Sequence, residues 1–412
     1  MDTVKTAVLD IKQIIDNSLI ETHFQPLVSL RKKTVIGYEA LSRGIDPLTG
    51  ALIPPIELFD AARQKGLVSE LDRLCRKKAV SSYYPVYRDN PDLLLSINFD
   101  ISILDDTTVE SNMLLELVSQ YDMDPGSIMI EIVESCNSST GVLKTFVQNY
   151  RENGFLIALD DMGQSNSNWD RIFSIGPQVI KIDRSLVLDV SKSFYKQELV
   201  RSLVNLGHKT GAVVVAEGIE NGEDAAGILE LGVDVLQGFF FSEPVLPTEI
   251  PVDQVFTRIG EQSRNFKDHM LSRVKQKKDT FRFLDHITAE IKNELSSCYG
   301  NELDSMLSEL LPAYNEIHCG YILDSNGIQV TETVVNPGFS AVTSNRLFRP
   351  AEKGEDLSFK DYYYFINAGM MKYTTGPYIS TASGELCTTL STSFTSIDGE
   401  EYILCIDYHT EY

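Results

Sequence analysis

Short apolar runs alternate with helix-length amphipathic segments over the first 250 residues. The runs typical of strands are THFQPLV, VIGYEAL, LLLSINF, IMIEIV, FLIALDD, VIKID, AVVVAE and VLQGFFF. Most of the gaps between them can hold a helix. Eight strands separated by helices indicate an α/β fold, a TIM-like (β/α)8 barrel. The first link, at residues 30–35, is too short for a parallel crossover, so we expect the first strand to run antiparallel to the second.

The pattern changes twice after the last of these runs. A proline-punctuated segment, PVLPTEIP, follows the barrel, and apolar residues then recur at helical spacing. From residue 318 onward, short β-branched and aromatic runs are separated by turns, which is typical of an antiparallel sheet. The order of these runs resembles PAS-like or Cache-type sensor domains. We therefore expect a barrel at 1–250, a helical linker at 251–317 and an α+β, PAS/Cache-like domain at 318–412.

Polar motifs stand at the ends of the strand-like runs. They read YEALSRG (38–44), SIN (96–98), EIVE (131–134), LDD (159–161), KID (181–183), AEGIE (216–220) and QG (237–238). The carboxyl ends of parallel barrel strands face one side, so side chains far apart in sequence converge there. Carboxylate and amide oxygens, without Cys or His, suit hard cations such as Mg²⁺, Mn²⁺ or Ca²⁺ rather than zinc. The motifs predict a metal site at that end of the barrel.

The adjacent aspartates of the LDD motif can both reach a metal site only if the strand bends there. Two metal ions can activate a water and neutralise charge during phosphodiester hydrolysis, and Asp160 and Asp161 are suited to such a pair. In a regular strand their side chains would point to opposite faces. A bend from strand to loop is therefore expected at this position.

Composition narrows the possible partners and the compartment. The formal net charge is −23, so the chain is a poor general binder of DNA or RNA. Its six cysteines form no CxxC pair and no zinc-type spacing with His, which indicates free thiols in a reducing compartment. No run approaches the ~20 apolar residues of a membrane span, and the first residues lack signal-peptide features. We expect a cytoplasmic protein without a membrane partner.

The motif YEALSRG is the signature of the EAL domain, a bacterial module that binds and usually hydrolyses cyclic di-GMP. The later motifs follow in the order and spacing of that family, so the first 250 residues or so resemble an EAL domain. The resemblance implies hydrolysis of cyclic di-GMP to the linear dinucleotide pGpG, with Mg²⁺ or Mn²⁺ as cofactor and Ca²⁺ as a non-productive or inhibitory occupant. It also implies a homodimer, and a C-terminal domain that could hold an unknown small ligand.

The resemblance assigns a role to each motif residue. One metal would be surrounded by Glu39, Asn98, Glu131 and Asp160, and the other by Asp160, Asp161 and Glu217. The catalytic candidates are Glu39, Lys181 and Glu217, with Lys181 near the attacking water as electrostatic support or proton acceptor. The substrate contacts would be Gln25, Leu41, Arg43, Asp183, Gln237 and Pro244. Among these, Arg43 would meet a phosphate and Asp183 a guanine, while Gln237 would hold a water or a substrate oxygen. The residues that would brace the loop after Asp161 are Glu134 and Glu220.

That loop departs from the family pattern. It reads MGQSNSNW at residues 162–169, where the family reads close to FGTGYSSL, so a glycine and an aromatic anchor are lost at Ser165 and Asn166. In the family this loop positions the second metal, and a misplacement of about 1 Å can cost about a hundredfold in rate. The sequence therefore leaves two functions open. The chain is a cyclic di-GMP phosphodiesterase, or a receptor with little or no turnover that signals through its C-terminal domain.

Overall fold

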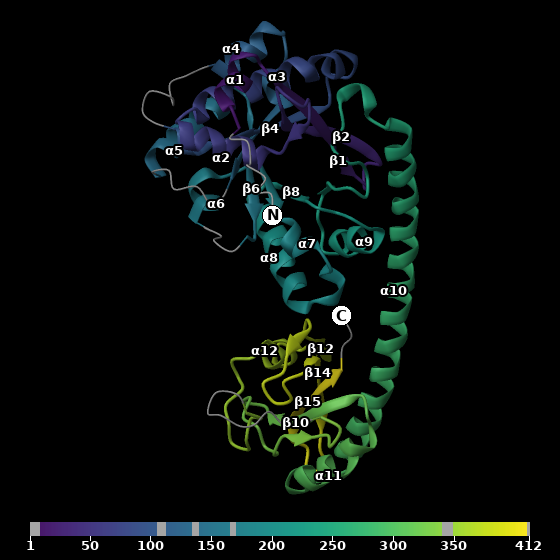
Figure 1. Cartoon of the computed structure of the whole chain (residues 1–412). Coiled ribbons are helices and arrows are strands. Elements are labelled where there is room, and N and C mark those ends of the chain that lie inside the picture. Colours follow the sequence, from purple (N-terminus) through teal and green to yellow (C-terminus); the bar gives the residue numbers. More distant parts are fainter. Residues whose placement is uncertain (1–8, 105–112, 134–139, 165–169, 340–348, 410–412) are drawn as a thin grey trace, which may run out of the picture. The chain divides into compact units, whose positions relative to one another are not determined.

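The computed structural model (Figure 1) describes residues 9–104, 113–133, 140–164, 170–339 and 349–409. Their contacts divide the chain into two compact units, one reaching to Leu271 and the other beginning at Ser272. Among the helices in these ranges, none combines the length and the apolar character that crossing a membrane requires.

The first unit is a closed barrel. The order of its strands is β1 (Ile20–Ser29), β2 (Thr34–Ile45), β4 (Leu94–Phe99), β5 (Ile128–Val133), β6 (Leu156–Met162), β7 (Val179–Ile182), β8 (Val213–Ala216) and β9 (Val235–Leu236). Strand β2 and strands β4 to β9 pair in parallel, whereas β1 is antiparallel to both β2 and β9 and closes the barrel. A short strand, β3 (Leu52–Ile53), extends the sheet at β2. The α/β barrel predicted from the sequence and its antiparallel first strand are both confirmed.

One helix precedes the first strand, and the others lie between strands along the chain. They are α1 (Ile11–Asp16), α2 (Pro55–Lys65), α3 (Val68–Asp89), α4 (Met113–Gln120), α5 (Thr140–Glu152), α6 (Asp170–Ile175), α7 (Arg184–Val187), α8 (Phe194–Thr210) and α9 (Gly222–Glu230). One apolar cluster joins strand residues such as Ile130 and Ile180 to helix residues such as Phe146 and Leu203. Strands that are covered in this way carry Val, Ile and Leu in near-continuous runs, which explains why the sequence pattern was readable.

The helix α10 (Val252–Ser296) contributes to the cores of both units. In its first turns, Val255 and Ile259 belong to the apolar cluster of the barrel, and the Arg258 guanidinium donates a hydrogen bond to the Phe240 carbonyl. Near its other end, Ile291 and Leu295 belong to the apolar cluster of the second unit. The segment that the sequence places between two domains is therefore partly built into each core.

The second unit contains an antiparallel sheet with helices on its two faces. Its strands are β10 (Ile317–Asp324), β11 (Val334–Val335), β12 (Lys372–Thr374), β13 (Tyr378–Ile379), β14 (Leu386–Thr395) and β15 (Glu401–His409), with β15 between β10 and β14. On one face, Leu404 and Ile406 pack with α10 and α11 (Leu303–Leu310). On the other face, Ile403 and Cys405 pack with α12 (Asp361–Asn367). The C-terminal sheet expected from the sequence is present.

Candidate functional site

The strand-end motifs form a polar layer on top of an apolar layer inside the barrel. The apolar layer consists of Leu27, Met129, Ala158, Val179, Val215 and Val235. Two residues further along the parallel strands stand Glu131, Asp160, Lys181, Glu217 and Gln237. Residues i and i+2 of a strand face the same side, so these polar side chains share the interior at the carboxyl ends of the strands. The structure thus brings together the residues that the sequence selected from separate motifs.

Lys181 lies at the centre of this layer and is fully buried. Its Nζ is 2.5 Å from Glu217 Oε1, 2.6 Å from Glu131 Oε1, 3.3 Å from Glu39 Oε2 and 3.5 Å from Asp160 Oδ1. Burial alone would lower the pKa of Lys181, but the four carboxylates, Asp160 first, raise it well above its ordinary value. In this arrangement Lys181 is an ammonium ion.

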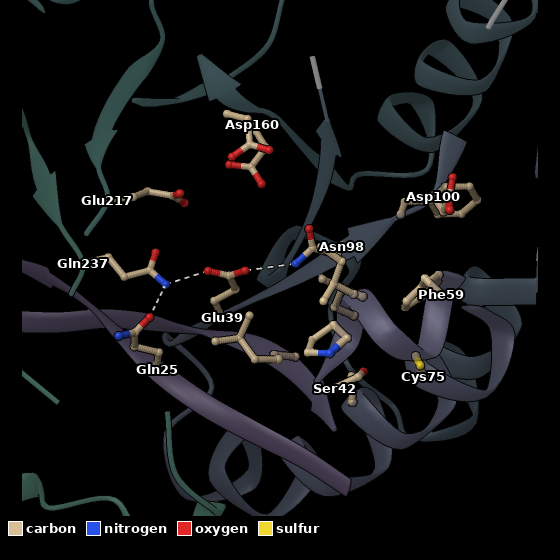
Figure 2. Close-up of a pocket in the computed structure, with 18 of the residues that line it drawn as sticks. Gln25, Glu39, Ser42, Phe59, Cys75, Asn98, Asp100, Asp160, Glu217 and Gln237 are labelled. Atoms are coloured by element: carbon tan, nitrogen blue, oxygen red, sulfur yellow. Dashed lines mark hydrogen bonds between the residues drawn. The ribbon is translucent and has the colours of Figure 1, made fainter. Parts of the chain in front are cut away.

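Glu39 is held by two side-chain amides from other strand ends (Figure 2). Its Oε1 accepts a hydrogen bond of 2.9 Å from Asn98, and its Oε2 accepts one of 2.6 Å from Gln237, whose amide also donates to Gln25. Burial would raise the pKa of Glu39, but Lys181 and these amide donors lower it overall. Glu39 therefore stays ionised and keeps a fixed orientation.

The two adjacent aspartates lie on the predicted bend. The β6–β7 register is irregular between Leu159 and Met162, and Asp161 adopts a left-handed φ of 60°, which is uncommon for a residue with a side chain. As a result, ligand oxygens of Asp160, Asp161 and Glu217 lie within 4.8 Å of one another. Burial and the neighbouring Asp160 raise the pKa of Asp161 to about 6. Backbone strain of this kind is common at functional sites.

The donor set fits divalent cations. Four carboxyl groups, of Glu39, Glu131, Asp160 and Glu217, contact one lysine, and Asp161 lies beside them. Burial, and then the neighbouring carboxylates, raise the pKa of Glu131 and of Glu217 well above the ordinary value, so one lysine does not balance the negative charge of the fully ionised cluster. Two oxygens, Glu131 Oε2 and Gln237 Oε1, are buried and accept no hydrogen bond from the residues that the structure describes. Buried polar atoms normally have partners, and oxygen-only sites suit Mg²⁺, Mn²⁺ or Ca²⁺.

A cavity of about 1220 Å³ opens over this layer. The predicted site residues that line it are Gln25, Glu39, Leu41, Asn98, Asp160, Asp161, Glu217, Glu220 and Gln237. Glu131 and Lys181 are fully buried and do not line it. A space of this size exceeds the upper end of the usual range for small-molecule sites, which suits a large ligand.

Three arginines in the wall of this cavity were missed by the sequence analysis. The Arg76 guanidinium lies 2.5 Å from the buried Asp72 and 4.0 Å from the centre of the Phe99 ring. Arg63 lies 3.5 Å from Asp100, and Arg184 lies 2.5 Å from Glu220. The sequence signal for Arg76 was its spacing from Asp72. Two opposite charges four residues apart at core positions of a helix indicate a buried ion pair, because charged residues are rarely buried without a partner. No motif marked the other two.

Three residues assigned to substrate by resemblance do not line the cavity. Arg43 is half-buried and its guanidinium donates to the Ser42 carbonyl; burial lowers its pKa. Asp183 caps α7 by accepting from the Ser185 amide. The Pro244 carbonyl lies 3.3 Å from His23 Nδ1. Their assignments stay predictions.

The altered loop is described only at its beginning. Met162 is buried in the barrel core. Gly163 has a φ of 106°, and an added Cβ would stand 2.3 Å from Leu186 Cδ1, so any other residue would be strained there and would displace Leu186. The Gln164 amide donates to Asp183 Oδ2. Residues 165–169 and Glu134, one of the two predicted bracing residues, lie outside the described ranges.

A closed barrel with an antiparallel first strand, and with carboxylates and one lysine at its strand ends, defines the class of protein. The chain belongs to the EAL domain family, whose sequence pattern matches residues 9–244.

Curated relatives align over the same part of the chain. The signaling protein YkoW of Bacillus subtilis is 28% identical over 58% of this chain and 30% of its own length. The cyclic di-GMP phosphodiesterase PdeR of Escherichia coli is 27% identical over 57% of this chain and 35% of its own length. The cyclic di-GMP phosphodiesterase RocR of Pseudomonas aeruginosa is 27% identical over 58% of this chain and 61% of its own length. The chain therefore spans less than two thirds of the length of each relative.

A solved structure resembles both units. The Bacillus subtilis YkuI protein, solved with cyclic di-GMP and calcium, covers 98% of this chain and 100% of its own, with a TM-score of 0.78 and 22% identity. At that identity the likeness establishes the fold alone. It includes the C-terminal region, so the expected layout of an EAL barrel followed by a second domain is that of YkuI.

Proposed function

We propose that this protein binds cyclic di-GMP and hydrolyses it to the linear dinucleotide pGpG with divalent cations. The observation that carries the proposal is the convergence of four carboxyl groups around Lys181, with Asp161 beside them, below a cavity of about 1220 Å³. A phosphodiester of a small nucleotide fits this site better than a nucleic acid does, because the net charge of the chain is −23. Relatives named as cyclic di-GMP phosphodiesterases support the choice of nucleotide.

Two overlapping ligand sets would hold the cations, Mg²⁺ or Mn²⁺ for turnover and Ca²⁺ as a non-productive occupant. The first set is Glu39, Asn98, Glu131 and Asp160, and the second is Asp160, Asp161 and Glu217, whose oxygens lie within 4.8 Å of one another. When bound, such a pair supplies an activated water and neutralises charge on the reacting phosphate.

The side chains around the ligands have defined tasks in this proposal. Asn98 and Gln237 orient Glu39 through its two oxygens. Gln237 Oε1, which makes no hydrogen bond to any described residue, is available for a water or a substrate hydroxyl. Lys181 places a positive charge below the reacting phosphate and stabilises negative charge there. Its surroundings favour electrostatic support over proton acceptance, because four carboxylates hold the ammonium form.

The altered loop favours a second function, that of a receptor with little or no turnover. Gln164, which replaces a threonine of the family pattern, donates to Asp183, the residue that the resemblance assigns to guanine. A loop that displaces the second metal by about 1 Å would reduce turnover about a hundredfold and leave nucleotide binding largely intact.

One experiment separates the two functions. Purified protein in excess is mixed with cyclic di-GMP and Mg²⁺ or Mn²⁺, and the linear product is followed in a single turnover, while calorimetry with Ca²⁺ measures binding. Product formation on the time scale of minutes supports the enzyme. Saturable binding without product supports the receptor, and the absence of binding with every cation contradicts both.

The remaining assignments are parts of the same proposal. We propose that the protein is a cytoplasmic homodimer and that residues 318–412 form a regulatory domain joined to the barrel by the helical segment 251–317. Light scattering tests the dimer, since one chain has a mass of 46.1 kDa.

A further inference from the structure

The second unit contains a cavity of its own. It has a volume of about 550 Å³, which is within the range of small-molecule sites. Three tyrosines, Tyr321, Tyr362 and Tyr378, line it together with Asp407. Tyr362 lies on α12 and the others lie on strands, so the cavity is on the face of the sheet that α12 covers.

Asp407 is the most unusual residue of this cavity. It is 3% exposed and lies on β15, the strand between β10 and β14, where the register places Cys319 on one side and Thr389 on the other. Its Oδ1 accepts a hydrogen bond of 2.7 Å from Thr389, and its Oδ2 accepts from the hydroxyls of Ser380 at 3.2 Å and Tyr378 at 3.3 Å. On the β10 side, the Cys319 thiol lies 3.5 Å from Oδ2. The carboxyl group is therefore held in one orientation by residues from both sides.

All of these donors are neutral. Within the described part of the chain, no Lys, Arg or His nitrogen lies within 4.0 Å of the Asp407 carboxylate. The two cationic residues that line the cavity are engaged or exposed: Arg349 lies 2.5 Å from Glu355 and 3.2 Å from Glu352, and Lys360 is exposed. Burying a carboxylate without a cation is unfavourable, and here the carboxylate also borders a cavity.

We propose that this cavity is a binding site for a small molecule that carries a protonated amino group, with Asp407 as its anchor. The ammonium group would pair with Asp407, and the tyrosines would pack against the rest of the molecule. Aromatic faces attract cations as well as apolar groups, so both parts of such a ligand are matched by the cavity. The site lies within the second unit and does not depend on the proposed activity of the barrel.

A purely structural acid is the competing explanation. Burial raises the pKa of Asp407, and a protonated carboxyl group would need no cation. The two explanations differ in one measurable respect, because only an ionised carboxylate prefers an amine over an alcohol of the same shape.

The test uses the full-length protein and three matched pairs of probes: ethylamine and ethanol, isobutylamine and isobutanol, and benzylamine and benzyl alcohol. Ligand-detected NMR measures the affinity of each probe. The melting temperature of the protein, taken at a probe concentration of about 100 times the dissociation constant, shows whether the probe stabilises the folded state. We expect at least one amine to bind saturably, at least about tenfold more tightly than its alcohol, and to raise the melting temperature. If no amine binds better than its alcohol, the proposal is wrong.

Substitutions test whether the amine binds at Asp407. Asp407→Asn keeps the size of the side chain and should remove the preference for the amine. Glu401→Gln is the matched control, because it removes one carboxylate from an exposed position of the same strand, and it should change nothing. Tyr378→Phe keeps the ring and the carboxylate and should weaken amine binding about threefold, so the proposal remains testable if Asp407→Asn does not fold. Unchanged amine preference in Asp407→Asn, or an equal loss in Glu401→Gln, would contradict the assignment.

Discussion

The two units of this chain bury carboxylates in opposite surroundings. In the barrel, four carboxyl groups from different strand ends share one lysine, and Glu131 Oε2 has no hydrogen-bond partner among the described residues. In the second unit, Asp407 is alone and is surrounded by hydroxyl groups. The first arrangement has more negative charge than one cation balances, which favours divalent metals. The second has a single charge in an aromatic cavity, which favours a monovalent organic cation.

The difference follows from the topology of the two sheets. Parallel barrel strands all end on the same side, so a residue at the end of each strand reaches a common site. An antiparallel sheet has no such shared end, and a polar residue in its middle meets only the residues on the neighbouring strands. The barrel therefore brings together polar side chains from seven motifs, whereas the second unit positions one residue by the register of three strands.

The largest expected effect is a loss of stability when the lysine at the centre of the barrel site is replaced. Lys181→Met keeps the length of the side chain but leaves four carboxylates without their shared cation. We expect a loss of about 3–5 kcal/mol in the free energy of unfolding, measured by urea denaturation, and partial recovery when Mg²⁺ or Ca²⁺ is added. Lys192→Met is the control, since Lys192 forms an exposed pair with Asp189, and the loss of an exposed pair should have a much smaller effect on stability. Equal losses in both variants would mean that the cluster is not held by its lysine.

A second prediction concerns the metal ligands. Glu39→Gln removes a charge but keeps the side-chain shape, and we expect turnover to fall by about a hundredfold or more while cyclic di-GMP still binds. Single-turnover assays compare it with Glu57→Gln, an exposed position on α2 that should keep full activity. Full activity in Glu39→Gln would remove Glu39 from the metal site.

The barrel and most of its site could be predicted because both depend on local patterns. Covered parallel strands show apolar runs, and the functional residues follow those runs at fixed offsets, as Lys181 follows Val179. The bend at Asp161 was also accessible, since two adjacent aspartates can serve one site only if the strand turns.

Other features depended on contacts that no local pattern encodes. The KID motif does not show that Lys181 meets four carboxylates, because its partners lie up to 142 residues away. The pairing of Arg184 with Glu220 had no signal in sequence either. Asp407 resembles any polar residue in an alternating strand until the register places Cys319 and Thr389 beside it. In the same way, helical spacing in 251–317 predicted a helix but not that Val255 and Ile259 join the barrel core.

A third prediction sharpens the choice between enzyme and receptor. We expect the combined substitutions Met162→Phe, Gln164→Thr, Ser165→Gly and Asn166→Tyr to raise turnover about tenfold, or about 1.4 kcal/mol in activation free energy. They restore the family loop and remove the amide that binds Asp183. Gly163 is kept, because its positive φ and the close Leu186 side chain favour glycine there. The same loop combined with Glu39→Gln should remain inactive, and equal rates with and without the new loop would show that it does not limit the reaction.

The smallest expected effect concerns a second buried titratable group of the C-terminal unit. His318 is fully buried, and its Nε2 has no hydrogen-bond partner among the residues described. Burial, and then the charge of His409, lower its pKa to about 4. The folded protein therefore keeps His318 neutral, whereas the unfolded chain binds a proton below a pH of about 6.5. Stability from this group is complete above that pH and is lost as the pH falls toward 4.

We expect His318→Phe to flatten this dependence. Phenylalanine fills a similar volume beside Phe339, whose ring centre lies 3.8 Å from that of His318, and it cannot take up a proton. Between about pH 7.5 and pH 5, the wild-type protein should lose about 1–2 kcal/mol more than the variant, measured as a difference in melting temperature. The barrel carboxylates titrate in both proteins and cancel in this difference. His286→Phe, at an exposed position, should retain the wild-type dependence. If His318→Phe also retains it, then His318 is protonated in the folded state, and the second unit buries positive charge as well as the carboxylate of Asp407.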